Sequence, residues 1–323
     1  VEASRAREEL ARRLELLRKT VRRLGSRNGD ERALRDEVLS FGERLCAPVV
    51  EAALGSSNVE AETRRARDLL VTSEHFGRAR VKWPATRRAV RRKLQGRRPV
   101  QLIPGFVGAS ASSRTTTLGR GGSDLTAVVL GATLDAEEVE IWTDVDGVMT
   151  GDPQIVSTPR TVPSLSWEAM GILSRYGAQV LQASAVDRAQ EMSLPIRIRN
   201  ARRPNRGGSR IGSDGCGARH SAAVAVSASV PQDSRKAKAG TDPVLPPGLA
   251  VVGARAMPGI EARLRRALED AAVHVMAVAS APADSLVFVV PARERRRATE
   301  AAHFELFESG ESTERPLRRT SQR

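Results

Sequence analysis

The segment TTTLGRGGSDLTA, residues 115–127, decides the fold that we expect for this chain of 323 residues. It joins a loop with three glycines to a predicted helix over residues 124–134. Glycine lets the backbone approach a ligand closely, and the first turn of a helix presents unpaired N–H groups and a positive dipole end. The segment therefore predicts a ligand-binding loop at a helix N-terminus, formed by Gly119, Gly121 and Gly122.

The other residues of this segment suit an anionic ligand. Arg120 has a planar guanidinium that matches a carboxylate or a phosphate. Ser123 and Asp124 stand where an N-cap is expected. A capped helix after a flexible loop is the simpler alternative, but arginine, two glycines, serine and aspartate in succession favour a binding site.

Strands and helices alternate on both sides of this segment, which predicts an α/β fold with a parallel or mostly parallel sheet. The predicted helices cover residues 1–25, 32–54, 59–72, 124–134, 166–176 and 178–192, and the predicted strands cover 99–107, 138–145 and 195–199. Residues 200–247 collect Gly, Ser, Pro and charges around one strand candidate at 222–230. From residue 249 the order strand–helix–strand–strand–helix predicts a small α+β unit.

Two more motifs carry chemistry. In IWTDVDGVMTGDP, residues 141–153, a buried strand brings Thr143 and Asp144 to the end of a sheet, where α/β proteins bind ligands. In SFGERL, residues 40–45, the pattern places Glu43 early in a helix. Each motif alone is also compatible with ordinary turn chemistry or a solvated charge.

Together and in this order, the three motifs resemble the aspartate kinase family of the amino acid kinase superfamily, over residues 30–212. GFVG at 105–108, LPIRIRN at 194–200 and GSRIG at 208–212 fit the same family. The resemblance implies an amino-acid kinase (carbamate kinase-like) sandwich that lacks its first strand, followed by a small α+β domain. It also implies ATP and Mg²⁺ as cofactors, and transfer of the γ-phosphoryl group to the side-chain carboxylate of L-aspartate. The product would be 4-phospho-L-aspartate, in lysine, threonine and methionine biosynthesis.

The resemblance assigns a role to each matching residue. Arg120 would bind a carboxylate of aspartate, Glu43 its amino group, and Phe106 would wall the pocket. The reacting end would be lined by four consecutive residues, Gly121, Gly122, Ser123 and Asp124. The nucleotide would be held by Thr143 and Asp144 and by the positions now occupied by Met149, Gln154 and Gln179. No residues are predicted to form a metal site of their own.

Several positions depart from the family pattern. The family's opening strand, of the type Lys-Phe-Gly-Gly-Thr-Ser, is not in the sequence, which indicates a fragment of a longer protein or a decayed homologue. The family has arginine at Gln154, lysine at Gln179 and tyrosine at Met149, and His-Pro where this chain has Gln182 and Ala183. Losing one charge-stabilising group typically lowers an enzymatic rate roughly 100- to 1000-fold. Two functions therefore remain open: an aspartate kinase under feedback control, or a catalytically inactive homologue that binds amino acids or regulates a partner.

The C-terminal residues 249–308 resemble an ACT domain, the effector-binding module of this family. Backbone N–H groups at Gly259 and Ile260, before a predicted helix, would hold an amino-acid effector. The expected domains are a kinase-like domain at 1–212, a linker with a remnant of a first ACT unit at 213–248, the ACT-like domain at 249–308 and a disordered tail at 309–323. A homo-oligomer through the ACT region, or pairing with an intact homologue, is expected.

Composition bounds the remaining possibilities. The net charge is +14, but the positive charge is mostly arginine spread along the chain without interleaved aromatic residues, which disfavours nucleic-acid binding. No apolar run of about 18 residues occurs, so no membrane span is predicted. Cys46 and Cys216 lie far apart and have no metal-ligand spacing, which suits a reducing cytoplasm.

Overall fold

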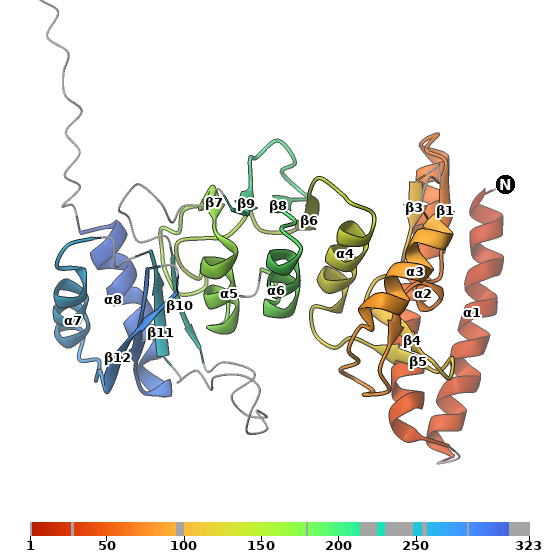
Figure 1. Ribbon diagram of the computed structural model, residues 1–323, viewed down its shortest axis with the longest axis horizontal. Coiled ribbons are helices and arrows are strands. Elements are labelled where there is room, and N and C mark those ends of the chain that lie inside the picture. Colours follow the sequence, from red (N-terminus) through yellow and green to blue (C-terminus); the bar gives the residue numbers. More distant parts are fainter. Residues whose placement is uncertain are drawn as a thin grey trace, which may run out of the picture. The chain divides into compact units, whose positions relative to one another are not determined.

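The computed structural model of the chain describes residues 2–26, 29–94, 100–178, 180–213, 225–229, 248–253, 257–282 and 284–309 (Figure 1). They divide into two compact units, which are described separately. Unit 1 contains Val1–Ile141 and Leu181–Arg197, and unit 2 contains Trp142–Val180 and Ile198–Arg323. The predicted tail after residue 309 and most of the predicted linker lie outside the described residues. The predicted domain boundaries stay a prediction.

Unit 1 begins with two long helices that lie side by side, α1 (Glu2–Gly25) and α2 (Glu31–Ser56) (Figure 1). The carboxylate of Asp30 caps α2 by accepting hydrogen bonds from the backbone N–H groups of Arg32, at 3.1 Å, and Ala33, at 3.4 Å. Such a cap stabilises a helix by about 1 kcal/mol because it pairs N–H groups that have no partner within the helix. Both helices were predicted from the sequence.

Short strands follow in unit 1. β1 (Ala61–Thr63) pairs in parallel with β3 (Val100–Leu102). In a second sheet, β2 (Val71–Thr72) pairs in parallel with β4 (Val107–Ser110), which pairs antiparallel with β5 (Thr115–Thr117). The predicted helix over residues 59–72 is therefore wrong, because this stretch forms β1, the 3-10 helix η1 (Ala66–Asp68) and β2. Pairing with distant strands and burial of Leu69 and Leu70 override its local helical spacing.

The described residues of unit 1 form three more helices: α3 (Trp83–Leu94), α4 (Gly122–Thr133) and α6 (Ala183–Glu191). α3 was not predicted, and α6 is shorter than the predicted helix over 178–192. α4 packs against both α3 and α6. One apolar core beneath these elements consists of Leu69, Leu70, Ala79, Val90, Leu94 and Leu118.

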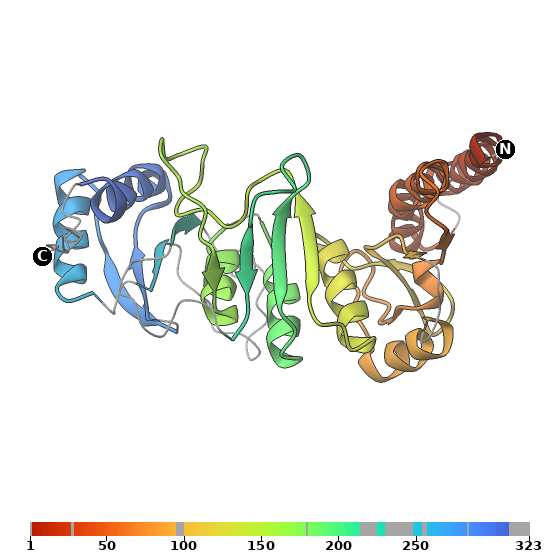
Figure 2. The same ribbon diagram turned by 90° about the horizontal axis from the view of Figure 1, so that it is seen from above.

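A four-stranded sheet in the order β6-β8-β9-β7 carries the second motif (Figure 2). Its strands are β6 (Val139–Thr143), β7 (Ser164–Leu165), β8 (Ile196–Asn200) and β9 (Ser209–Ile211). Along the chain, β6 and β8 both run from unit 1 into unit 2. Helix α5 (Trp167–Arg175) follows β7, and its N-cap Ser166 accepts a hydrogen bond from the Ala169 N–H at 3.1 Å.

The C-terminal part of unit 2 has the predicted order of elements. An antiparallel sheet in the order β10-β11-β13-β12 contains β10 (Ala225–Ser229), β11 (Gly248–Val252), β12 (Ala277–Ala281) and β13 (Ser285–Val289). Helix α7 (Ile260–Asp270) packs against α8 (Arg295–Phe307), which is preceded by the 3-10 helix η4 (Ala292–Glu294) (Figure 1). The buried side chains of Leu249, Leu264 and Phe288 belong to the core shared by β11, α7 and β13.

Candidate active site

The glycine-rich motif forms the N-terminus of α4. Gly121 is the N-cap residue and has a φ of +69°, a conformation that side chains disfavour. The helix therefore begins at Gly122, so Ser123 and Asp124 lie in its first turn and are not N-caps as predicted. A Cβ atom on Gly122 would lie 2.9 Å from the Cδ2 atom of Phe106. The backbone of Gly122, the first residue of α4, is thus packed directly on Phe106, the residue that was predicted to wall the pocket.

Phe106 adopts a conformation that is unusual for a bulky residue, with a φ of +68°. Its N–H donates to the Thr126 hydroxyl at 3.1 Å, and its carbonyl oxygen accepts from the Leu118 N–H at 2.9 Å. Backbone strain of this kind costs on the order of 1–3 kcal/mol and tends to occur at ligand sites. The two hydrogen bonds hold the Phe106 backbone in this conformation beside the glycines.

Glu43 lies near the middle of α2, not early in a helix as expected from the sequence. Its Oε1 atom accepts a hydrogen bond from the Ser123 hydroxyl at 3.4 Å. The adjacent Arg120 is exposed, and its side chain has no ion-pair or hydrogen-bond partner among the described residues. Unit 1 therefore brings the Glu43 carboxylate and the Ser123 hydroxyl together at the start of α4, and Arg120 lies in the loop directly before that helix.

Asp124 is half-buried in the same turn. Burial raises the pKa of its carboxyl group, and a hydrogen bond from the Gln182 backbone N–H opposes the rise. The side chain of Gln182 also fills the space above Gly121, where a Cβ atom would lie 1.7 Å from the Gln182 Cγ atom. Gln182, where the resemblance leads us to expect histidine, is therefore in contact with the motif.

The raised pKa of Asp124 leads to a test of its ionisation. In the folded chain the carboxyl group holds its proton more tightly than in the unfolded chain, where the pKa is near 3.8. Ionisation therefore lowers stability as pH rises from that value through the raised pKa, and the whole penalty is present above the raised pKa. Asp124→Asn, which stays neutral and still accepts the Gln182 N–H, should raise the melting temperature at neutral pH but not in acid.

Thermal unfolding of both proteins at neutral pH and near pH 3 checks this expectation. Asp270→Asn serves as the control because Asp270 is exposed at the end of α7. A difference between Asp124→Asn and the native protein that is the same at both pH values would contradict the assignment.

Asp36 is a buried carboxylate that the sequence analysis missed. It is 2% exposed and accepts hydrogen bonds from the Gly77 N–H at 2.9 Å, the Thr117 N–H at 2.7 Å and the Thr117 hydroxyl at 3.0 Å. Thr117 is followed directly by Leu118 and the glycine-rich loop. Asp36 thus ties that loop to α2, on which it precedes Glu43 by seven residues and so shares its face. That spacing is the signal that could have revealed it.

The residues predicted to hold the nucleotide belong to unit 2. At the end of β6 the Thr143 hydroxyl donates to the Asp144 carboxylate at 3.2 Å. Met149 forms an isolated bridge with Thr161, and Gln154 is exposed on a turn that is closed by its N–H and the Asp152 carboxylate at 2.9 Å. Gln179 lies outside the described residues. The structure thus describes four of these five positions, all of them in unit 2.

Helix α8 contacts the same loop. The ring of His303 is fully buried, and its Nε2 atom lies 3.0 Å from the Thr150 hydroxyl oxygen. Its Nδ1 atom lies 2.9 Å from the Glu308 carboxylate, and its ring centroid lies 4.7 Å from that of Phe307, with the two rings tilted by 41°. A Cβ atom on Gly151 would lie 2.9 Å from this ring. The loop between Met149 and Gln154 is therefore packed against the C-terminal helix.

The residues predicted to bind an effector lie at the start of α7. Gly259 is the N-cap with a φ of +71°, and no atom lies within 4 Å of the position that its Cβ would take. The N–H of Ile260 donates to the Met257 carbonyl oxygen at 3.3 Å. Effector binding at these residues stays a prediction.

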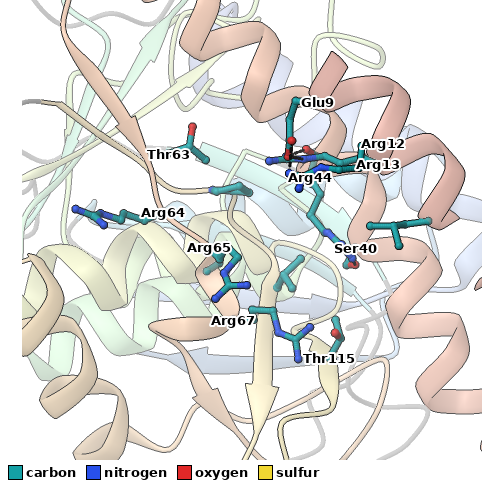
Figure 3. Close-up of a pocket in the computed structure, with 14 residues that line it drawn as sticks. Glu9, Arg12, Arg13, Ser40, Arg44, Thr63, Arg64, Arg65, Arg67 and Thr115 are labelled. Carbon is teal, nitrogen blue, oxygen red and sulfur yellow. Dashed lines mark hydrogen bonds and ion pairs between the residues drawn. The ribbon is translucent and has the colours of Figure 1, made fainter. Parts of the chain in front are cut away.

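A cavity of about 250 Å³ lies elsewhere in unit 1, between α1, α2 and the segment around η1 (Figure 3). Arginines dominate its lining, but they are paired: Arg13 with Glu9 at 2.6 Å, and Arg65 with Asp68 at 2.7 Å. None of the predicted site residues lines it. We assign no ligand to this cavity.

Two features are absent from the residues that the structure describes. There, no group of three His, Cys, Asp or Glu side chains is arranged to hold a metal ion. Within the same residues, no helix combines the length and the apolar character needed to cross a bilayer.

Comparison with known proteins identifies relatives. Residues 3–200 match the model of the amino acid kinase family. The aspartokinase of Corynebacterium glutamicum is 34% identical over 275 residues, which cover 82% of this chain and 61% of that protein. The lysine-sensitive aspartokinase 3 of Escherichia coli is 33% identical over 207 residues, which cover 64% of this chain and 46% of that protein. The chain thus spans less than two thirds of the length of these relatives.

Solved structures show the same fold. Aspartokinase III of Escherichia coli, in complex with aspartate and ADP, superposes with a TM-score of 0.81 at 23% identity, over 94% of this chain and 82% of that one. The aspartate kinase of Clostridium acetobutylicum superposes with a TM-score of 0.68 at 19% identity, over 92% and 80% of the two chains. The mixed α/β architecture predicted from the motifs is confirmed.

Proposed function

We propose a function from one premise: the chain belongs to the amino acid kinase family and, within it, to the aspartate kinase group. The proposed activity is transfer of the ATP γ-phosphoryl group to the side-chain carboxylate of L-aspartate. Support comes from the solved Escherichia coli relative that holds aspartate and ADP. Lysine, threonine and methionine biosynthesis is the proposed context.

The observation that carries this proposal is the arrangement at the start of α4. Arg120 is free to bind a carboxylate of aspartate, and Glu43 is held toward Ser123 where an amino group would find a negative partner. Phe106 and the bare backbone of Gly122 form the wall beside them. These groups position a small zwitterion, and positioning is the main contribution that a protein makes to phosphoryl transfer.

The reaction needs no general base. An oxygen of the aspartate side chain, already ionised, forms a bond to the γ-phosphorus while the bond from that phosphorus to the oxygen bridging to the β-phosphate breaks. ADP leaves with the electron pair, and the product is an acyl phosphate. ATP with its Mg²⁺ supplies the phosphoryl group. We expect Thr143 and Asp144 to hold it, because Thr143 ends β6 and Asp144 directly follows, which places two polar side chains at the end of a sheet strand.

A second function is supported by the residues at the positions predicted to hold the nucleotide. Gln154 and Gln179 are neutral where the family has cations, and no lysine occurs between Lys93 and Lys236. Cations at a transferring phosphoryl group stabilise the transition state strongly, so their loss lowers turnover more than it lowers aspartate binding. The alternative is thus a homologue that binds aspartate but does not phosphorylate it.

One experiment separates the two functions. The full chain is incubated with aspartate, ATP, Mg²⁺ and hydroxylamine, and aspartyl hydroxamate is measured, while aspartate binding is measured by calorimetry. Arg120→Ala should weaken aspartate binding about 10- to 100-fold, because one charge-assisted contact contributes about 1.5–3 kcal/mol. Arg35→Ala, which changes an exposed arginine of α2 that pairs with Glu31, should leave binding unchanged.

Each outcome has one meaning. Hydroxamate that requires Arg120 supports the kinase, and aspartate binding without hydroxamate supports the second function. Equal aspartate affinity in Arg120→Ala and the native chain would contradict the proposed site.

Regulation and assembly follow from the same premise. The solved Escherichia coli aspartokinase III with lysine and aspartate bound supports an amino-acid effector for this group, and residues 249–308 are where we expect it to bind. Assembly through this region, alone or with an intact homologue, and a cytoplasmic location complete the proposal.

A further inference from the structure

The turn that follows β8 is unusually basic and has no acidic residue. Residues 199–206, RNARRPNR, contain four arginines, at positions 199, 202, 203 and 206. All but Arg199 are exposed. We refer to residues 201–206 as the arginine turn.

Hydrogen bonds attach the arginine turn to the end of β6. The Ala201 N–H donates to the Thr143 carbonyl oxygen at 2.7 Å, and the Asn200 side-chain amide donates to the Asp144 carbonyl oxygen at 3.3 Å. The turn is therefore adjacent to the two residues that we expect to hold the nucleotide.

Asn200 keeps the turn in one conformation. It is 1% exposed, and its side-chain oxygen accepts from the N–H groups of Arg202, at 2.8 Å, and Arg203, at 3.2 Å. Its amide donates to the Asp146 carboxylate at 2.7 Å. Fixed backbone geometry lowers the entropy cost of holding the arginine side chains at one place.

One carboxylate forms ion pairs with two arginines of this turn. Asp146, whose side chain is 12% exposed, pairs with Arg203 at 3.1 Å and with Arg206 at 3.9 Å. Each guanidinium has five N–H donors, so a single ion pair leaves most of them available. Arg202 has no side-chain partner among the residues that the structure describes. The turn thus offers three arginine cations, two of which pair with the Asp146 carboxylate.

The geometry points to the arginine turn as the binding site for the phosphates of the nucleotide, an inference that rests on the proposed function. Arg202, Arg203 and Arg206 supply the positive charge that the neutral residues at Gln154 and Gln179 do not. One guanidinium group can donate two parallel hydrogen bonds to the oxygens of one phosphate, so arginines in this position suit a triphosphate. The ligand class is a nucleoside triphosphate, and the recognised part is its polyphosphate chain.

The test uses the full chain, with MgATP and inorganic tripolyphosphate as probes and calorimetry as the readout. Arg202→Gln removes a charge that is not paired, so it should not disturb folding, and it should weaken both probes about tenfold. The double variant Arg203→Gln/Arg206→Gln should weaken both about 100-fold. Aspartate affinity should not change in either variant.

Arg296→Gln is the matched control, because Arg296 is an exposed arginine of α8 that pairs with Glu300 at 3.1 Å. It should leave the affinity for both probes unchanged. Probe binding that is equal in all variants, or that is lost equally in the control, overturns the inference and leaves the proposed function standing. Absence of probe binding to the native chain also overturns it.

The hydroxamate assay keeps the two proposals apart. Probe binding that depends on the arginine turn, without hydroxamate from the native chain, supports the phosphate site and contradicts the kinase activity. Hydroxamate that forms normally in Arg202→Gln and in the double variant, at limiting ATP, contradicts the phosphate site alone.

Discussion

Replacing Asp36 by alanine is expected to lower the free energy of unfolding by about 3–5 kcal/mol, because three buried donors would lose their acceptor. The donors are the backbone N–H groups of Gly77 and Thr117 and the Thr117 hydroxyl. Water can replace the lost carboxylate as their acceptor only if β5 moves away from α2. Loosening of β5 should in turn weaken aspartate binding, since the glycine-rich loop begins directly after it.

Urea unfolding followed by circular dichroism measures this loss, and hydrogen exchange of residues 115–118 locates it. Glu37→Ala is the matched control, because Glu37 is the next residue of α2 and its ion pair with Arg44, at 2.9 Å, is partly exposed. Such pairs contribute about 0–1 kcal/mol. Equal stability losses in the two variants would show that Asp36 does not anchor the loop.

Gly208→Ala is expected to be as damaging in unit 2, with a loss of about 3–5 kcal/mol. A Cβ atom at this position would lie 2.0 Å from the Ile198 carbonyl oxygen, and the φ of Gly208 is +69°. An alanine side chain is disfavoured for two reasons: the backbone of this residue is left-handed, and its Cβ atom would overlap the backbone of β8. Relief requires β8 and β9 to separate, which would displace the arginine turn between them.

The neighbouring glycine provides the control. Gly207→Ala places its Cβ where no atom lies within 4 Å, so it should change the free energy of unfolding by less than about 1 kcal/mol. Urea unfolding and tripolyphosphate binding of the two variants can be compared directly. If Gly207→Ala is as destabilising as Gly208→Ala, steric exclusion is not the cause.

The sequence predicted those parts of the fold and site that depend on neighbours along the chain. Gly121 and Gly122 predict a close approach of the backbone, and the short apolar run before Thr143 predicts a strand. The C-terminal order of strands and helices followed from periodicity alone. In each case the determining residues lie within one element or one turn.

Features that depend on distant partners escaped prediction. The Asp36 carboxylate accepts hydrogen bonds from Gly77 and Thr117, which lie 41 and 81 residues away along the chain. The stretch over residues 59–72 has helical spacing but is drawn into strands by pairing with residues near 100 and 110. In the sequence the arginine turn is part of a chain that is basic throughout. Only the structure shows that Asn200 fixes its backbone and that Asp146 pairs with Arg203 and Arg206.

The contact between His303 and Thr150 has a practical consequence for protein production. A shortened version that stops at residue 212, where the sequence suggests that the kinase-like part ends, would lack α8 and leave the Thr150 hydroxyl and Gly151 without the ring that covers them. Expression boundaries chosen from motifs alone would therefore cut through a packed surface. Anyone preparing a minimal soluble version for crystallography should retain the chain at least to Glu308, the residue that holds the other side of that histidine.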